Sequence, residues 1–244
     1  MIAYITDLRE MARFGTDPFG VLMAAGNIAY GDQPFTGVWA VGKSAVLGRL
    51  NRQFTLCGTL SRAVGAELAE FLPMLGCNAL LAPPETNLPG WHTVKSGVVL
   101  RYDGTDSDAL SDGPASAYCA ILSDCASDWI RIDSPDSFYV DLSHRLRHAC
   151  IHGRIVYEDA KPVACALTSG ETDCAAVIGG VGCLPAYRGR GYARRAVQAL
   201  CALQARKRRA VYLMTGAHLV PFYRKCGFTP FGAWNEYQPI ANEC

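Results

Sequence analysis

The sequence predicts an α/β fold, because strand-like and helix-like segments alternate along most of its 244 residues. The clearest pattern lies in the second half. Residues 191–207 carry apolar side chains at helical spacing, for example Ala193, Val197 and Leu200. An apolar, strand-like segment at 175–184 precedes this helix, and a loop with two glycines joins the two elements. Half of all residues are apolar and 18% are charged, which is the composition of an ordinary globular protein.

The remaining elements follow from the same periodicities and from turn residues. In the first half we expect helices at 7–14, 18–30 and 60–75, and strands at 37–41, 44–50, 53–57, 78–82 and 94–102. In the second half we expect helices at 117–127, 136–150 and 219–225, and strands at 154–158, 162–168, 210–214 and 228–236. The second half therefore predicts a mixed central sheet flanked by helices.

The segment 103–114 is acidic, rich in small residues and nearly free of hydrophobic ones, which is typical of a linker. We therefore predict a first domain at 1–102, a linker at 103–114 and a second domain at 115–244.

Composition excludes some classes of partner. The net charge is +1 and the pI is near 7.5, so no overall field draws the protein to nucleic acid or to an anionic membrane. The chain has no basic segment before an apolar run at its start and no apolar run of transmembrane length. The eleven cysteines are odd in number, irregularly spaced and form no C-x-x-C pair, which indicates reduced thiols in a cytoplasmic protein.

The loop before the helix at 191–207 reads Arg188-Gly189-Arg190-Gly191. A glycine loop that opens a helix binds anions, because its free backbone N–H groups converge and the helix dipole favours negative charge. The arginines add bidentate donors for phosphate. The residues therefore predict a phosphate or pyrophosphate site.

Two motifs carry a family resemblance. Arg188-x-x-Gly191-x-Ala193 resembles the Q/R-x-x-G-x-G/A acyl-CoA signature of the GNAT (GCN5-related) N-acetyltransferases. Further on, Tyr223-x-x-x-Gly227-Phe228 resembles the late Y-x-x-x-G-F segment of that family. The resemblance covers residues 115–244 and implies the GNAT acyl-CoA N-acyltransferase fold.

The resemblance also implies a reaction and a site. Acetyl-CoA would be the donor, and a primary amine on a small molecule or peptide would attack it directly. Tyr223 stands where the family keeps the general acid that protonates the departing thiolate. The residues that would bind acetyl-CoA form two groups: Val181, Gly182 and Cys183 along the pantetheine arm, and Arg188, Gly189, Arg190, Gly191, Tyr192 and Ala193 around the pyrophosphate.

The sequence departs from the family at the general base. Many relatives place a glutamate on the central strand, but residues 176–181 contain no acid. Glu171, Asp173 and His152 are the nearest candidates in sequence, and none is assigned. The missing base leaves a second reading open, namely a non-catalytic acyl-CoA-binding or regulatory module.

The first half resembles a decayed copy of the second. At one constant offset, Gly58, Arg62, Ala63, Val64, Ala66, Ala69 and Leu80 align with Gly191, Arg195, Ala196, Val197, Ala199, Ala202 and Leu213. The equivalent loop at 55–60 lacks the arginines and the second glycine. We therefore predict two GNAT-like halves in tandem. The first half would bind no CoA and would shape the acceptor pocket.

Two other motifs compete for a function. Residues 37–44 match the pattern G-x-x-x-x-G-K-[ST], but their interior is itself strand-like, so a β-turn with a solvent-facing lysine is expected instead of a phosphate loop. His144, His148, Cys150 and His152 have spacings that suit zinc. The family needs no metal, and imidazoles are favoured at a helix C-terminus, so we predict no metal site.

The basic run 206–209 lies at a helix end, where the dipole favours cations, which makes nucleic acid the lesser reading. Contact with the CoA phosphates stays an alternative for it. Cys183 would lie beside the thioester. Nothing marks it as an activated thiolate, so a small strand residue is expected rather than an acyl-accepting nucleophile.

Overall fold

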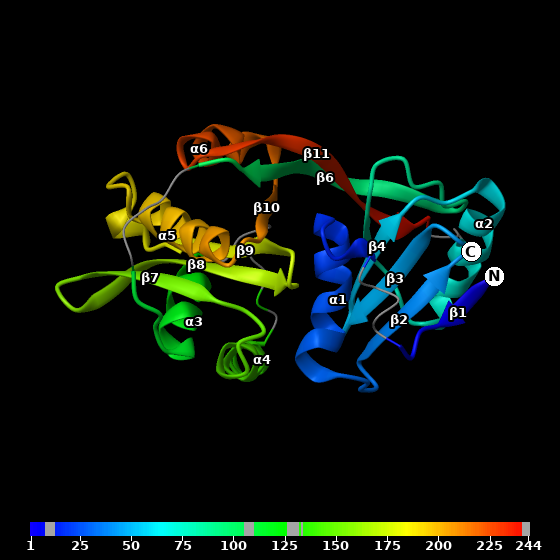
Figure 1. Ribbon diagram of the computed structural model, residues 1–244, viewed down its shortest axis with the longest axis horizontal. Coiled ribbons are helices and arrows are strands. Elements are labelled where there is room, and N and C mark those ends of the chain that lie inside the picture. Colours follow the sequence, from blue (N-terminus) through cyan, green and yellow to red (C-terminus); the bar gives the residue numbers. More distant parts are fainter. Residues whose placement is uncertain (8–12, 105–109, 126–131, 133, 241–244) are drawn as a thin grey trace. The chain divides into compact units, whose positions relative to one another are not determined.

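The computed structural model describes residues 1–7, 13–104, 110–125, 132 and 134–240 (Figure 1). The chain forms two compact units that interleave along the sequence. Unit 1 comprises Met1–Val99, Met214–Ala217 and Phe231–Cys244, and unit 2 comprises Leu100–Leu213 and His218–Pro230. The strands β6 (Trp91–Tyr102) and β11 (Phe228–Pro239) contribute residues to both units.

Unit 1 is a mixed sheet between two helices. Its elements in chain order are β1 (Ile2–Tyr4), α1 (Pro18–Tyr30), β2 (Thr36–Val41), β3 (Ala45–Leu50), β4 (Gln53–Gly58), α2 (Arg62–Met74) and β5 (Leu80–Ala82), with parts of β6 and β11. The strand order is β1-β2-β3-β4-β5-β11-β6. β1 to β4 are antiparallel neighbours, β4 and β5 are parallel, and β11 joins β5 antiparallel at Glu236↔Leu81.

The two faces of this sheet are covered separately, because successive side chains of a strand point to opposite faces. Val46 lies in a core cluster with Met23 of α1. Its neighbour Leu47 lies in another cluster with Leu68 and Leu72 of α2. The alternation of apolar residues along β3 therefore holds one helix on each face.

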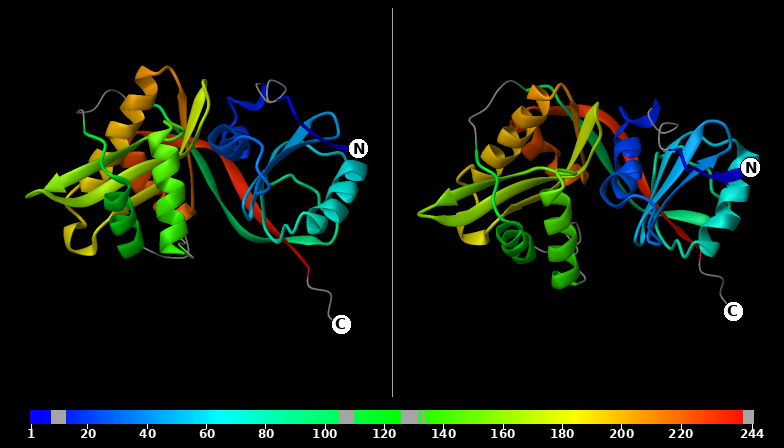
Figure 2. Two further views of the ribbon diagram at one scale, coloured as in Figure 1. Left: turned by 90° about the horizontal axis from the view of Figure 1, so that it is seen from below. Right: turned by 60° about the horizontal axis from the view of Figure 1, so that its bottom comes forward.

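Unit 2 has the same plan (Figure 1). Its elements are α3 (Ala115–Asp124), α4 (Pro135–Arg147), β7 (Gly153–Glu158), β8 (Lys161–Glu171), β9 (Ala175–Cys183), a 3-10 turn (Pro185–Tyr187), α5 (Tyr192–Arg206), β10 (Ala210–Thr215) and α6 (Val220–Lys225). The strand order is β11-β6-β10-β9-β8-β7. α3 and α4 lie on one face of β7, β8 and β9, and α5 lies on the other, as the two further views in Figure 2 also show.

The two halves repeat one topology. The series β2, β3, β4, α2, β5 has the same order and pairing as β7, β8, β9, α5, β10. In each series three strands are antiparallel, and the helix leads to a strand parallel to the third. This confirms the predicted α/β fold of two GNAT-like halves in tandem.

Most predicted elements are present, with shifted ends. The helix expected at 60–75 runs from Arg62 to Met74, because the Ser61 hydroxyl accepts from the Val64 N–H and caps its start. β8 continues to Glu171 and β11 to Pro239, beyond their predicted ends. Residues 8–12 of the helix expected at 7–14, residues 105–109 of the linker and residues 126–127 of the helix expected at 117–127 lie outside the described residues.

The compact units differ in kind from the predicted domains, since each unit draws on distant parts of the chain. The continuous ranges 1–102, 103–114 and 115–244 stay a prediction about domain organisation.

Around residues 37–44, β2 and β3 form a hairpin. Lys43 lies exposed in its turn, which confirms the expected β-turn. No helix in the described part of the chain is long and apolar enough to cross a membrane.

Candidate active site

The second half of β9 leaves its neighbour β10. The parallel register of these strands runs from Ala175↔Ala210 to Ile178↔Leu213 and ends there. At the same point the register of β8 and β9 is irregular, and Gly179 has no partner residue on β8. From Gly180 to Cys183, β9 is paired with β8, and its other edge is not paired with β10 or another described strand.

Val181 and Cys183 direct their backbone groups to that edge. The N–H of Leu184 donates to the carbonyl oxygen of Val163 at 2.9 Å, on the β8 side. Backbone groups alternate along a strand, so those of Cys183 and Val181 point away from β8. In agreement, the Cys183 carbonyl oxygen accepts from Arg188 Nε at 3.2 Å. The structure therefore orients Val181 and Cys183 as an added extended ligand would need.

Gly182 has a different task. Its backbone is directed to β8, and a Cβ built on it would lie 3.0 Å from Cγ2 of Ile121 and 3.2 Å from Cδ2 of Leu122. α3 thus packs closely on β9 because position 182 has no side chain. This residue shapes the strand edge through packing.

The loop that follows is open at its two glycines. Gly189 and Gly191 have φ values of +79° and +83°, and a Cβ built on either meets nothing within 4 Å. Gly191 is the N-cap of α5, and no side chain caps the helix there. The first N–H groups of a 15-residue helix therefore open beside two bare glycines, which is the arrangement that binds phosphate.

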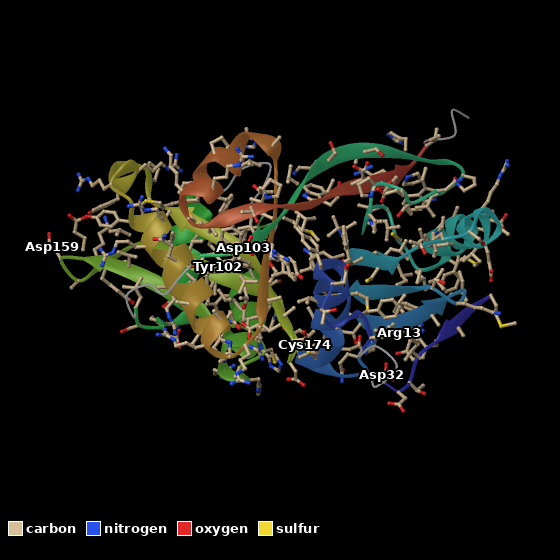
Figure 3. All side chains as sticks on the ribbon, turned by 45° about the horizontal axis from the view of Figure 1, so that its top comes forward. Arg13, Asp32, Tyr102, Asp103, Asp159 and Cys174 are labelled. Carbon is tan, nitrogen blue, oxygen red and sulfur yellow. The ribbon has the colours of Figure 1, made fainter. Side chains whose placement is uncertain are left out.

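The tip of the β7–β8 hairpin lies beside this loop; Figure 3 labels Asp159 at the tip and Cys174 in the β8–β9 turn. Glu158 accepts from the Tyr192 hydroxyl at 2.5 Å and pairs with Arg190 at 3.5 Å. The Glu158 hydrogen bond raises the pKa of Tyr192. Lys161 lies over the Tyr187 ring, 5.4 Å from its centroid. Sequence reasoning missed these contacts, since the only local signal was the hairpin turn itself.

Tyr223, the predicted general acid, is buried on α6 with 7% of its surface exposed. Its ring packs against Phe222 and Phe228, with centroids 5.0 and 6.0 Å away. Burial raises the pKa of Tyr223 far above its ordinary value, so the hydroxyl keeps its proton. Burial raises the pKa of Cys226, the C-cap of α6, to about 11, and the charge of Arg194 in the first turn of α5 offsets part of this rise.

Glu171 and His152, two of the three candidate bases, lie together. His152 Nδ1 is 2.9 Å from Glu171 Oε2. The Glu171 carboxylate is 5% exposed and also accepts from Thr168, Gln204 and Arg209. Burial works to raise the pKa of Glu171, but the hydrogen bonds from His152 and Thr168 and the charge of Arg209 outweigh it, so the pKa is lowered. A carboxylate so committed is a poor proton acceptor, and it holds its neighbours in place.

This cluster predicts a loss of stability in acid. We expect Glu171→Gln to lower the free energy of unfolding at pH 7 by about 2–4 kcal/mol, because the new amide hydrogens face donors and Arg209 loses its partner. The folded pKa of Glu171 is depressed. Its contribution is therefore complete above the unfolded value and is lost as pH falls through the folded one, so the two proteins converge only below the depressed folded pKa. Urea unfolding at pH 7 and at a series of lower pH values measures this.

The control for that experiment is Asp173→Asn, which changes an exposed carboxylate in the β8–β9 turn. It should alter the unfolding free energy by less than about 0.5 kcal/mol. A Glu171→Gln protein as stable as this control at pH 7 would show that the cluster contributes nothing.

The residues whose spacing suits zinc do not form one group in the structure. The rings of His144 and His148 meet edge to face at the end of α4 with centroids 4.3 Å apart, whereas His152 belongs to the Glu171 cluster. Within the residues that the structure describes, no group of three or more His, Cys, Asp or Glu side chains could hold a metal ion.

The structure gives contacts for two residues of the basic run and shows no activation of the Cys183 thiol. Lys207 contacts His152 and Arg209 contacts Glu171, so half of the run 206–209 is engaged inside unit 2. Burial raises the pKa of the Cys183 thiol, which argues against an activated thiolate.

Unit 2 is thus an α/β domain in which a splayed strand pair is followed by an uncapped helix start lined by glycines. Residues 117–228 match the sequence model of the acetyltransferase (GNAT) family. The C-terminal half of the chain is therefore a GNAT domain. No curated protein matches the chain.

Solved structures share the fold along the whole chain. A tandem GNAT protein from the clavulanic acid biosynthesis pathway is 12% identical with a TM-score of 0.59, and the match covers 100% of this chain and 99% of that one. A GCN5-related N-acetyltransferase from Kribbella flavida is 15% identical with a TM-score of 0.58, over 83% and 89% of the two chains. A GCN5-related N-acetyltransferase from Sphaerobacter thermophilus is 14% identical with a TM-score of 0.55, over 100% and 96%.

Proposed function

We propose that the protein is an N-acetyltransferase that moves the acetyl group of acetyl-CoA to a primary amine on a small molecule or peptide. One observation carries the proposal: the open N-terminus of α5, with Gly189 and Gly191, follows directly on the β9 edge that β10 has left. A pyrophosphate on the loop and a pantetheine arm along the edge would use both features at once. We place the reaction in the cytoplasm, since all the described cysteines are free thiols.

In this proposal the chain supplies binding, polarisation and one proton. The N–H groups of residues 188–193 and the side chains of Arg188 and Arg190 hold the pyrophosphate. Val181 and Cys183 bind the pantetheine amides as a neighbouring strand would. A backbone N–H near the irregular pairing at Gly179 polarises the thioester carbonyl.

The transfer balances without a covalent enzyme intermediate. The neutral amine attacks the thioester carbon, the new C–N bond forms and the C–S bond breaks. Tyr223 donates its proton to the departing thiolate sulfur, water takes the proton that the nitrogen loses, and the Tyr223 phenolate regains a proton from water. β9 carries no acid and Glu171 is committed, so the amine has to arrive unprotonated. The rate should rise with pH until the pKa of the acceptor amine is reached.

The test has two stages. Acetyl-CoA should raise the melting temperature, whereas ATP with Mg²⁺ should leave it unchanged. A free-thiol assay over a panel of amines, amino acids and peptides should then release CoA with at least one acceptor. Stabilisation by acetyl-CoA without thiol release from any acceptor would favour the non-catalytic acyl-CoA-binding module, to which the missing base on β9 also points. No stabilisation by acetyl-CoA would refute both functions.

A further inference from the structure

Three side chains, those of Glu171, His152 and Lys207, form a line of polar contacts at the C-terminal end of α5. Glu171 Oε2 lies 2.9 Å from His152 Nδ1, and His152 Nε2 lies 2.8 Å from Lys207 Nζ. Lys207 is the C-cap of α5, whereas the glycine loop is at its N-terminus. A helix of 15 residues is about 22 Å long, so this line is separate from the site described above.

The contacts define the state of the imidazole. A lysine ammonium has only donors, so His152 Nε2 must accept from Lys207. In a neutral imidazole Nδ1 then carries the proton and donates to Glu171. The carboxylate is itself held by Thr168, Gln204 and Arg209, and its pKa is lowered. The lone pair on Nε2 of His152 is therefore directed at the nitrogen of Lys207.

This is the arrangement that activates a nucleophile. A nucleophile lies within hydrogen-bond reach of a base, and a third group orients that base. The imidazole side chain is only 19% exposed, while Lys207 is exposed and can meet a reagent from solvent. Removal of a proton from the ammonium leaves an imidazolium beside a buried carboxylate, which stabilises it.

We propose that Lys207 is an activated amine, and that acyl thioesters modify it in preference to the other lysines of the chain. His152 Nε2 takes one proton from the ammonium. The amine nitrogen then attacks the thioester carbon, the C–N bond forms and the C–S bond breaks. The second nitrogen proton passes to the thiolate, so the products are an amide and a free thiol, and His152 returns its proton to water. The co-reactant is any small acyl thioester.

The test compares two lysines in one sample. The whole protein is incubated with S-acetyl-N-acetylcysteamine at pH 7.5, and peptide mass spectrometry follows acetylation over time. This thioester has no nucleotide, so the result does not depend on the proposed function of the glycine loop. Lys43, exposed in the β2–β3 turn, is the internal reference. Lys207 should be acetylated at least about tenfold faster than Lys43, in line with the lower range of general-base effects.

His152→Gln separates basicity from position. A glutamine can donate to Glu171 and accept from Lys207, but it takes up no proton near neutral pH. In this variant the rate at Lys207 should fall at least about fivefold toward that of Lys43, with the rate at Lys43 unchanged. Equal rates at Lys207 and Lys43 in the wild type, or a Lys207 rate that His152→Gln does not lower, would overturn the proposal.

Discussion

Replacement of Gly191 by glutamate is expected to weaken acetyl-CoA binding at least about 100-fold, a loss of about 2.7 kcal/mol in binding free energy. Gly191 is the N-cap of α5 and has φ of +83°, and the space where its Cβ would stand is open. The new side chain would therefore enter the open space that the phosphates are proposed to occupy. Its carboxylate would accept from the first N–H groups of α5 and would repel a phosphate there.

The matched control is Gly76→Glu. Gly76 follows α2, has φ of +73°, and is equally open around its Cβ position. Both variants thus carry a similar cost for a left-handed non-glycine residue, of about 1–2 kcal/mol. Isothermal titration calorimetry with acetyl-CoA should give wild-type affinity for Gly76→Glu and no detectable heat for Gly191→Glu. If Gly191→Glu binds within threefold of the wild type, the loop is not the pyrophosphate site.

This loop was predictable because its signals are local. The glycines, the arginines and the apolar spacing of α5 all fall within residues 188–207, and each acts on its own neighbours. The structure adds the φ values and the open space, which explain why glycine stands at positions 189 and 191. The same reasoning found that a helix followed by a strand recurs in both halves at one constant offset.

The parts that sequence reasoning missed depend on contacts between distant residues. β11 pairs with β5, so a strand from the end of the chain lies beside a strand from the first half. Glu158 reaches Tyr192 across the hairpin tip, over 34 positions of sequence. No spacing rule connects such residues, because tertiary packing decides which strand edges and turn tips meet.

The candidate base shows where sequence proximity misleads. Glu171, Asp173 and His152 are close to β9 in the chain, and two of them do lie together. Gln204, near the C-terminal end of α5, and Arg209, just after it, bind Glu171. They make Glu171 and His152 part of an ion cluster. Of the titratable groups that the sequence suggested for catalysis, Tyr223 is therefore the one proposed to transfer a proton.

Tyr223→Phe is expected to lower kcat by about 10- to 100-fold and to change the dissociation constant of acetyl-CoA less than about threefold. Phenylalanine keeps the ring contacts with Phe222 and Phe228 and removes only the hydroxyl. Tyr139→Phe, at an exposed tyrosine of α4, is the matched control and should leave both constants unchanged. Steady-state rates with a reactive amine and calorimetry with acetyl-CoA measure the two effects.

The expected size follows from the raised pKa of Tyr223. Burial keeps the phenol protonated, so the donor is in place at every working pH. The same shift makes it a weaker acid than a thiol of ordinary pKa, so the proton transfer to the thiolate is uphill and only partly advanced in the transition state. Such a donor contributes at the low end of general-acid effects. A Phe variant with full activity near neutral pH would show that the thiolate leaves without help from Tyr223.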